Sequence, residues 1–369
     1  MPPLLGGMER LNLHAALAIA ERSQVHVVGP AGCAESLPPA VTVDAIPVKP
    51  LWRFIVLATL AAIRSIVRQR PDMVFAGSGL TAPIAVICAR IARAKSVVYV
   101  HGLDITVEHP VYRRLWLPFI RATDVCIANS LGTSRLARDA GIRADRLVIV
   151  HPGVAMPGCD ANKHVGSFRA QHGLGTRPVL LAVGRLTPRK GVLEFVRDSL
   201  PIIAAAQPDA LLVVIGDEAP DALAGNGAGA RADIASMAET HGVPENVMFL
   251  GPRSDDELSA AYAAASVCIF PVRAQPGDVE GFGMVALEAA AHGLPTVAFE
   301  IGGIPDAVSN GVSGRLIRPG DYTAFADATL AYLGVDKGGF DPVACRAFAA
   351  NFEWEKFGSR LRAAIGYST

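Results

Sequence analysis

The sequence has few charged residues and no excess of either sign. Of its 369 residues, 18% are charged, and 34 Lys and Arg balance 34 Asp and Glu. This balance argues against a protein whose main task is to bind nucleic-acid phosphates. Hydrophobic residues make up 51% of the chain, enough for a large core, which excludes global disorder. The length predicts roughly two domains.

Paired cysteines and long apolar segments are also absent. The six cysteines form no CxxC pair and no zinc-ligand spacing, which favours a reducing, cytoplasmic compartment. Uncharged apolar runs such as residues 54–63 are far shorter than the roughly 20 residues of a spanning helix. Residues 1–7 contain no basic residue and no long apolar stretch, so we expect no signal peptide.

The charge is unevenly distributed along the chain. Residues 1–160 contain 17 basic and 11 acidic side chains, a net charge of +6. Residues 161–369 contain 17 basic and 23 acidic side chains, a net charge of −6. Opposite fields in the two halves predict two domains with different partners.

Short runs rich in Val, Ile and Phe alternate with Ala-rich, helix-like stretches. The predicted strands are Val25–Val28, Met73–Ala76, Val97–Val100, Val125–Ala128, Leu147–Val150, Val179–Val183, Leu211–Ile215, Val247–Leu250, Val267–Phe270, Thr296–Phe299 and Arg315–Ile317. Predicted helices include Leu51–Arg70, Val192–Leu200 and Gly283–His292. The alternation predicts an α/β fold with two parallel sheets, of five and six strands, separated by residues 152–177. Residues 222–230, rich in Ala and Gly, predict a surface loop.

Polar residues and glycines follow the predicted strands in both halves. His101-Gly102-Leu103-Asp104 follows one strand, Gly184-Arg185 a second and Gly216-Asp217 a third. Open α/β sheets bind ligands at the carboxyl ends of their strands. We therefore expect two such edges to form a ligand cleft between the domains.

The most specific motif is the stretch from Glu280 to Glu288. Seven residues separate the two glutamates, and the stretch includes Gly281, Phe282, Gly283, Met284 and Val285. Glycine amides at the start of a helix bind anions, and carboxylates accept hydrogen bonds from sugar and ribose hydroxyls. The alternative is an ordinary exposed pair of glutamates on an amphipathic helix.

A second motif places two cations near a strand end. Arg185 leaves the strand and Lys190 precedes the next helix, so both can contact a diphosphate. The alternative is a surface loop with solvated basic residues. For His101, the alternative is an ordinary histidine with satisfied hydrogen bonds at a strand end.

The segments GRLTPRKG, IGD, FLGPRSDDEL and FPVRAQPGDVEGFGMVALEAAAHGLPTVAFEIGGIPDAV together resemble the donor-binding half of family 4 retaining glycosyltransferases of GT-B fold. The resemblance is strong from Val179 to Gly320. It is weaker in the N-terminal half, where GGMER, HGLD and VHPGV carry it. It implies two Rossmann-like domains with parallel sheets facing across a cleft. It also implies an acceptor-binding domain at 1–158, a nucleotide-sugar domain at 159–345 and a C-terminal helix at 346–369 that returns towards the first domain.

The resemblance also implies roles for individual residues. Arg185 and Lys190 match the diphosphate-binding pair, Glu288 the residue that holds the ribose, and His101 a histidine beside the transferred sugar. Glu280 and the amides of residues 281–284 match contacts to the donor sugar, and Gly251–Arg253 lies where such enzymes hold the base. The remaining implied donor-site positions are Gly184, Gly216 and Val285, and those on the acceptor side are Gly6, Gly7 and Asp104.

The N-terminus departs from the family pattern. In the family a full strand precedes the Gly6-Gly7 loop, whereas here only residues 1–5 stand before it, two of them proline. So short a segment cannot form a central strand. We expect that the start lies upstream of Met1 or that the strand is lost, which puts the loop and the activity in question.

The family resemblance implies a retaining transfer of a hexose, with mannose from GDP-mannose favoured, to a lipid-linked or polysaccharide acceptor of the cell envelope. No DxD-like pair is present at the donor motifs, so we expect no obligatory metal and no cofactor besides the nucleotide-sugar substrate. Arginines mix with aromatics near Trp52 and near Trp116, and the two segments together in a basic half favour a peripheral protein on an anionic membrane. The alternative for either segment alone is a helix that faces the core and whose arginines are simply solvated. Alternatives are a UDP-hexose or UDP-GlcNAc transferase, a sugar-nucleotide epimerase and an inactive binding module.

Overall fold

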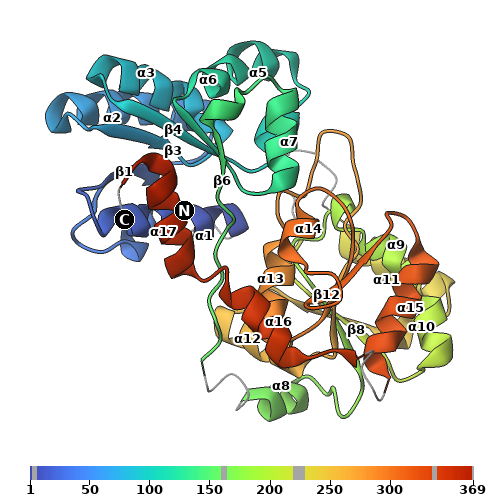
Figure 1. The fold of residues 1–369 in the computed structure, drawn as a ribbon. Helices are drawn as coiled ribbons and strands as arrows, with labels where there is room; N and C mark the ends of the chain where they lie inside the picture. Colours follow the sequence, from blue (N-terminus) through green and yellow to red (C-terminus); the bar gives the residue numbers. More distant parts are fainter. Residues whose placement is uncertain (2–5, 159–163, 219–228, 335–338, 368–369) are drawn as a thin grey trace. The chain divides into compact units, whose positions relative to one another are not determined.

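The computed structural model describes residues 1, 6–158, 164–218, 229–334 and 339–367 (Figure 1). The chain forms two compact units. Unit 1 comprises residues 1–153, 277–282 and 352–369, and unit 2 comprises residues 154–276 and 283–351. Within the described residues, every pair of neighbouring strands in a sheet is parallel.

Unit 1 contains two parallel sheets. The first pairs β1 (His26–Pro30) with β2 (Thr42–Ile46), and the second has the order β3-β4-β5-β6. The second sheet consists of β3 (Met73–Ala76), β4 (Lys95–Val100), β5 (Val125–Ala128) and β6 (Leu147–Ile149). The helices are α1 (Gly7–Ala20), α2 (Leu51–Gln69), α3 (Ala82–Ala92), α4 (Leu103–Thr106), α5 (Pro110–Leu115), α6 (Leu117–Ala122), α7 (Leu131–Asp139) and α17 (Trp354–Ile365).

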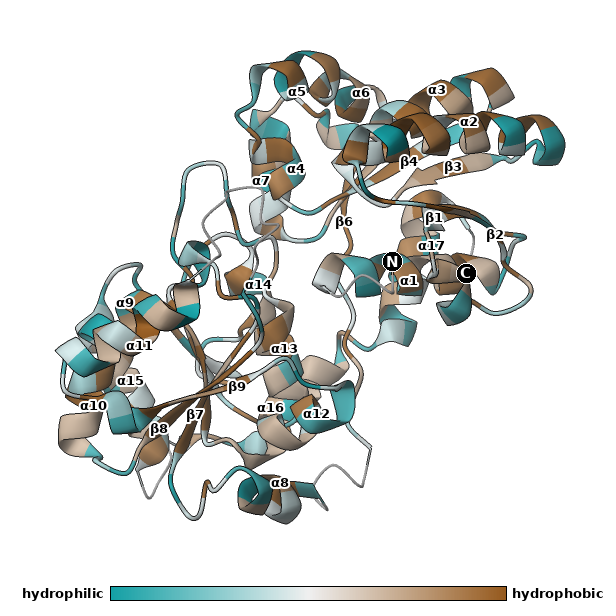
Figure 2. Ribbon diagram, turned by 180° about the vertical axis from the view of Figure 1, so that it is seen from behind, coloured by the Kyte–Doolittle hydropathy of each residue, from teal (hydrophilic) through white to brown (hydrophobic). Residues whose placement is uncertain are grey.

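Helices cover both faces of the four-stranded sheet because its strands are apolar on both faces. On β4, Val97 and Tyr99 pack with α1 and α17, whereas Val98 and Val100 pack with residues of α3, α6 and α7. Alternate residues of a strand point to opposite faces, so this near-continuous apolar run supports two helical layers. Both ribbon views show α1 and α17 on one side of the strands and α2 and α3 on the other (Figures 1 and 2).

The C-terminal helix α17 belongs to unit 1, where it packs on α1. Gly358 lies so close to α1 that an added Cβ would be 3.0 Å from the Ala18 Cβ. Arg362 donates a hydrogen bond of 2.9 Å to the Ala18 carbonyl, and the His14 and Trp354 rings stack 3.7 Å apart. The last described helix is therefore part of the N-terminal core.

The stacked His14 predicts a pH dependence of unfolding. Burial, with a smaller contribution from Arg10, lowers the pKa of His14 to about 4 from 6.5. The unfolded chain therefore binds the extra proton between these values, so the free energy of unfolding falls as the pH drops from about 6.5 to about 4. We expect a loss on the order of 1–2 kcal/mol, reduced by the partial solvent exposure of the ring. Urea unfolding of His14→Phe should show a flatter pH profile than the parent chain. Identical profiles would contradict this.

Unit 2 is built on one six-stranded sheet with the order β12-β11-β10-β7-β8-β9. Its strands are β7 (Val179–Val183), β8 (Leu211–Ile215), β9 (Val247–Gly251), β10 (Val267–Phe270), β11 (Thr296–Phe299) and β12 (Gly314–Ile317). Its helices are α8 (Val165–Gln171), α9 (Val192–Asp198), α10 (Leu200–Ala206), α11 (Ala230–Thr240), α12 (Asp255–Ala264), α13 (Met284–Ala291), α14 (Ile304–Ala307), α15 (Tyr322–Leu333) and α16 (Pro342–Ala350).

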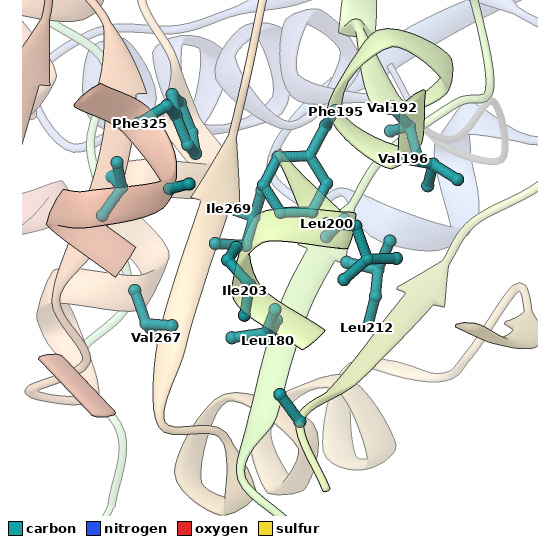
Figure 3. Close-up of a cluster of buried hydrophobic side chains, with 14 of the residues drawn as sticks. Leu180, Val192, Phe195, Val196, Leu200, Ile203, Leu212, Val267, Ile269 and Phe325 are labelled. Atoms are coloured by element: carbon teal, nitrogen blue, oxygen red, sulfur yellow. The ribbon is translucent and has the colours of Figure 1, made fainter. Parts of the chain in front are cut away.

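The sheet of unit 2 separates two hydrophobic clusters. Leu180 and Leu212 face the cluster that includes Phe195, Leu200 and Phe325, whose side chains Figure 3 shows packed against the strands. Their neighbours in sequence face the opposite cluster, with Tyr262 and Leu294. Strands coloured brown along their length in Figure 2 reflect this burial on both faces.

The structure contains all eleven predicted strands, with shifts of at most two residues at their ends, and differs from the sequence prediction in three respects. The N-terminal strands form two sheets, and the predicted set of five lacked β2. The predicted helix 192–200 is two helices, α9 and α10, that meet at Ser199. The stretch 152–177 contains the helix α8. The predicted missing strand at residues 1–5 and the loop at 222–230 fall mostly outside the described residues.

Within the described part of the chain, no helix combines the length and apolar character needed to cross a membrane.

Candidate active site

A small pocket lies at the carboxyl ends of β7 and β10 in unit 2. Gly184, Arg185 and Lys190 line it together with Phe270 and Pro271. The chain runs from β7 to β8 on one side, whereas β10 pairs on the other side of β7, so the strand order reverses here. Such a reversal is where open α/β sheets bind their ligands.

The loop between Arg185 and Lys190 is held close to the backbone that follows β10. Gly191 has a φ of 70°, and an added Cβ would lie 2.0 Å from the Pro271 carbonyl oxygen. The amide of Arg273 donates a hydrogen bond of 2.8 Å to the Arg189 carbonyl. Only glycine permits this approach at residue 191, so the loop has a fixed shape beside the pocket.

The two cations of this loop have different surroundings. The ammonium of Lys190 lies 4.9 Å from the centre of the Phe270 ring, a cation–π contact, and its side chain is half-buried. Arg185 is exposed at the end of β7. Both side chains line the same pocket, so one anionic group bound there can contact both.

Glycines end three neighbouring strands in a row. An added Cβ at Gly216 would lie 2.0 Å from the Gly184 carbonyl oxygen, and the Gly216 amide donates to the Gly251 carbonyl at 3.1 Å. Backbone therefore replaces side chains along the edge formed by β7, β8 and β9. Arg253 follows β9 and lies close to His172 and Glu257. Burial, and then Arg253, lowers the pKa of His172, whereas hydrogen bonds from Ser254, and to a smaller extent Arg253, lower the pKa of Glu257.

Glu288 is positioned by a hydrogen-bond network that the sequence analysis did not identify. The hydroxyl of Tyr262, on α12, donates to Oε2 of Glu288 at 2.8 Å. The ring of Tyr262 stacks on His292 at 5.1 Å, and His292 in turn contacts the Glu288 carbonyl at 2.8 Å and the Ser259 hydroxyl at 2.9 Å. Glu288 is half-buried, so the ordinary exposed helix-surface alternative does not describe it.

The boundary between the two units falls inside the Glu280–Glu288 motif. Residues 277–282 belong to unit 1, whereas Gly283, Met284, Val285 and Glu288 belong to unit 2. Gly283 has a φ of 102° and precedes the first residue of α13. The motif thus joins the two units covalently and contributes backbone to each.

In unit 1, the segment Glu280–Phe282 lies against the ends of two strands. An added Cβ at Gly281 would lie 2.1 Å from the His101 carbonyl oxygen and 2.6 Å from Nδ2 of Asn129. Phe282 is buried, and its ring lies 5.6 Å from that of His151. The backbone of Gly281 therefore lies against that of His101 at the carboxyl ends of β4 and β5, and Glu280 precedes Gly281 in the chain.

His101 is held by two contacts within unit 1. Its Nε2 contacts the Gly77 carbonyl oxygen at 2.9 Å, and because a carbonyl only accepts, Nε2 carries the proton. The His101 amide donates to Oδ2 of Asp104 at 3.0 Å. His101 and Asp104 are thus parts of one arrangement, in which Asp104 fixes the backbone of the loop.

Three buried side-chain polar atoms of unit 1 have no hydrogen-bond partner in the described structure, and two of them are amide oxygens. Oδ1 of Asn129 is one, on a residue that is 5% exposed, and Oδ1 of Asn12 is the other, beside Gly77. The third atom is the hydroxyl of Tyr112. Buried amides are almost always satisfied, so such atoms mark positions that a ligand or water completes. In the sequence, Asn129 could have been identified as a candidate site residue because it directly follows a strand. No sequence pattern identifies Asn12.

The predicted glycine loop and the aromatic segments fall on unit 1. Gly6 is the N-cap of α1, Gly7 is its first residue, and both are exposed. Trp52 is 68% exposed on α2. Trp116 is half-buried, and its indole N–H donates to the Leu80 carbonyl at 3.0 Å. Burial, and then Asp104, raises the pKa of the neighbouring Tyr112.

No group of three or more His, Cys, Asp or Glu side chains with the geometry of a metal site occurs among the described residues. The predicted independence from metal remains a prediction.

Comparison with known sequences gives matches to both halves of the chain. A family profile described as Glycosyltransferase Family 4 matches residues 5–156, and one described as Glycosyl transferases group 1 matches residues 177–334. The GDP-mannose-dependent alpha-(1-6)-phosphatidylinositol monomannoside mannosyltransferase of Mycolicibacterium smegmatis is 33% identical over 77% of this chain and 74% of that protein. The D-inositol 3-phosphate glycosyltransferase of Mycobacterium sp. is 36% identical over 50% of this chain and 40% of that protein.

Comparison with solved structures gives matches over nearly the whole chain. HepE of Anabaena in complex with UDP-glucose matches with a TM-score of 0.80 at 22% identity, covering 99% of this chain and 97% of that one. A glycosyltransferase from Rickettsia africae matches with a TM-score of 0.78 at 16% identity, covering 100% and 98%. At these identities the likeness establishes the fold, which is GT-B.

Proposed function

Since this chain belongs to the family 4 glycosyltransferases of GT-B fold, we propose that it moves a hexose, with retention of configuration, from a nucleotide-diphosphate sugar to a lipid-linked or polysaccharide acceptor. Mannose from GDP-mannose is the favoured donor, supported by the relative at 33% identity whose name states that dependence. The proposed place of work is the cytoplasm, at the inner face of the plasma membrane, in the synthesis of a cell-envelope glycan.

The pocket at the β7–β10 switch point is the observation that carries the proposal. Breaking the bond between a sugar and a diphosphate leaves negative charge on the leaving group, which fixed cations stabilise without reorganisation. Arg185 and Lys190 line that pocket together, beside the glycine backbone of Gly184. We assign them to the diphosphate.

The proposed sugar subsite lies in unit 1. There the backbone of Gly281, which follows Glu280, lies against the backbone of His101, and the buried Oδ1 of Asn129 adds an acceptor for a hydroxyl. The proposal includes no covalent nucleophile. Retention then requires the acceptor to attack from the face that the leaving diphosphate occupied.

Glu288 is proposed to accept hydrogen bonds from the ribose hydroxyls while Tyr262 fixes its orientation. We expect Glu288→Gln to weaken nucleotide binding by about 1.5–3 kcal/mol, because hydrogen bonds to a charged acceptor are the strong ones. Tyr262→Phe should weaken it less, because the carboxylate charge remains. Titration calorimetry measures both, with the exposed Glu239→Gln as a matched control. Unchanged binding in Glu288→Gln would make this residue a structural one only.

A donor screen tests the proposal as a whole. GDP-mannose, UDP-glucose, UDP-galactose and UDP-GlcNAc are each added, and the shift in melting temperature is measured with and without EDTA. We expect GDP-mannose to give the largest shift and EDTA to leave it unchanged. A larger shift with a UDP-sugar would overturn the donor assignment. A structural neighbour solved with UDP-glucose makes UDP-sugars the main competitors.

Analysis of the products formed from the same donors, together with the melting shifts, separates the other classes of function. Epimerisation or hydrolysis of the donor in the absence of acceptor would identify a sugar-nucleotide epimerase or hydrolase. Stabilisation by a donor without transfer to any lipid-linked or glycan acceptor would identify an inactive binding module. No shift with any donor would contradict nucleotide-sugar binding altogether.

A further inference from the structure

The outer face of α2 carries a continuous row of exposed apolar side chains. Trp52 is 68% exposed, Val56 50%, Leu60 59% and Val67 67%. Their spacing of four, four and seven residues places them on one stripe of the helix, whereas Ala58, on the opposite side, and Ile66, at the edge of the stripe, are buried. The helix therefore has an apolar inner face, as expected, and a second apolar face that points to solvent.

The neighbouring helix α3 extends this surface. Ile87 is 41% exposed and Ile91 57%, one turn apart. The two helices pack on each other and form one layer over the strands of unit 1 in both ribbon views (Figures 1 and 2). We refer to the exposed residues Trp52, Val56, Leu60, Val67, Ile87 and Ile91 as the α2–α3 face.

Basic residues flank the α2–α3 face without any acidic residue. They are Lys49, Arg53, Arg64, Arg68, Arg70, Arg90 and Arg93. Neither residues 49–71 nor residues 82–94 contain an Asp or Glu. On α2 itself, Arg53, Arg64 and Arg68 are exposed beside the apolar stripe. One partner bound there can therefore contact both the apolar side chains and the positive charges.

We propose that the α2–α3 face docks on an anionic lipid surface. Exposed apolar side chains on a helix with a basic flank are the features that place a helix in the membrane interface. A second copy of this chain is disfavoured, because a symmetric contact would bring two such basic surfaces together. The inference rests on the proposed function in one respect, the lipid-linked acceptor, which a docked enzyme would bind at the membrane surface.

The surface differs from the second segment that the sequence indicated. Around Trp116 the rings of Tyr112 and Trp116 stack 6.0 Å apart and are partly buried. The Trp116 indole also donates a hydrogen bond to the Leu80 carbonyl, so these rings are not available as a group for insertion. The lipid surface is therefore assigned to α2 and α3.

Flotation with vesicles tests the inference without any donor. The protein should float with phosphatidylcholine vesicles that contain phosphatidylglycerol and remain at the bottom with phosphatidylcholine alone. Added salt should reduce flotation, because it screens the arginines. In Arg64→Gln/Arg68→Gln, partitioning should fall about 25-fold, at about fivefold for each basic residue near the surface.

An apolar variant and a control locate the surface. Trp52→Ser/Leu60→Ser should lower partitioning at least about tenfold, since each large side chain loses its burial in lipid. Val343→Ser, a change at a residue that is 66% exposed in unit 2, should leave it unchanged. Melting temperature and its shift by the donor are measured for every variant. A variant that no longer floats but still shows the melting shift with the donor has lost lipid binding alone. The test of the lipid surface is therefore independent of the test of the proposed function.

Three results would overturn the inference. The first is a parent chain that does not float with the anionic vesicles at low salt. The second is a Trp52→Ser/Leu60→Ser variant that floats as well as the parent. The third is a concentration-dependent dimer, seen by sedimentation and lost in that variant, without vesicle binding, which would assign the α2–α3 face to a second copy of the chain.

Discussion

Replacing Arg185 or Lys190 by alanine is expected to lower kcat/KM by about a hundredfold or more. Both side chains line the pocket at the ends of β7 and β10, where the proposed reaction leaves charge on a diphosphate. A fixed group that stabilises such charge is typically worth about 10²–10³ in turnover. Steady-state kinetics with saturating acceptor measures the effect, and it should fall on kcat as well as on KM.

A control on the next helix separates this role from a general effect of charge. Arg197 lies on α9 and forms an exposed ion pair with Asp198 at 2.7 Å. Such pairs contribute little to stability, so Arg197→Ala should retain the parent kinetics. Parent-like kinetics in both Arg185→Ala and Lys190→Ala would exclude the assigned role.

The strands of both units could be predicted from the sequence because their apolar runs are bounded by polar residues and glycine. The edge strand β2 could not. Among the described strands it pairs with β1 alone, and it includes Asp44, whose carboxylate contacts His26 Nε2 at 3.2 Å. A short strand with one neighbour and a polar face lacks the continuous apolar run of a buried strand. It also lacks clear turn residues that would mark its two ends.

The division of the N-terminal strands into two sheets could not be predicted either. Which strands pair depends on tertiary contacts between segments far apart in the chain, and the local pattern carries no information about it. The break between α9 and α10 had a local signal. Pro201 lacks an N–H and is favoured in the first turn of a helix, where that N–H has no partner, so it signals that a new helix, α10, begins beside it after α9 ends at Asp198.

The site was predictable where a motif is contiguous and unpredictable where side chains meet through the fold. GRx4K and the Glu280–Glu288 motif gave residue numbers directly, and the structure brings Gly184, Arg185 and Lys190 to one pocket. Tyr262 lies 26 residues from Glu288, and only the packing of α12 on the sheet brings its hydroxyl to that carboxylate. No spacing rule connects the two residues.

Gly281→Ala is expected to have a large steric effect. An added Cβ would lie 2.1 Å from the His101 carbonyl oxygen and 2.6 Å from Nδ2 of Asn129, so the segment 277–282 must move away from the ends of β4 and β5. Glu280 is adjacent and moves with it. A displacement of about 1 Å at a reacting group can cost on the order of a hundredfold in rate, and overpacking typically costs about 1–3 kcal/mol of stability.

Kinetics and urea unfolding of Gly281→Ala together test the place of this segment in the site. The matched control is Gly166→Ala on α8, where nothing lies within 4 Å of the added Cβ and alanine favours the helix. That variant should keep its activity and unfold at the same or a slightly higher urea concentration. We expect Gly281→Ala to lose activity by far more than its loss of stability explains, since the diphosphate pocket in unit 2 remains intact. Nucleotide binding retained while turnover falls would place Gly281 with the transferred sugar, and unchanged turnover would remove residues 280–282 from the site.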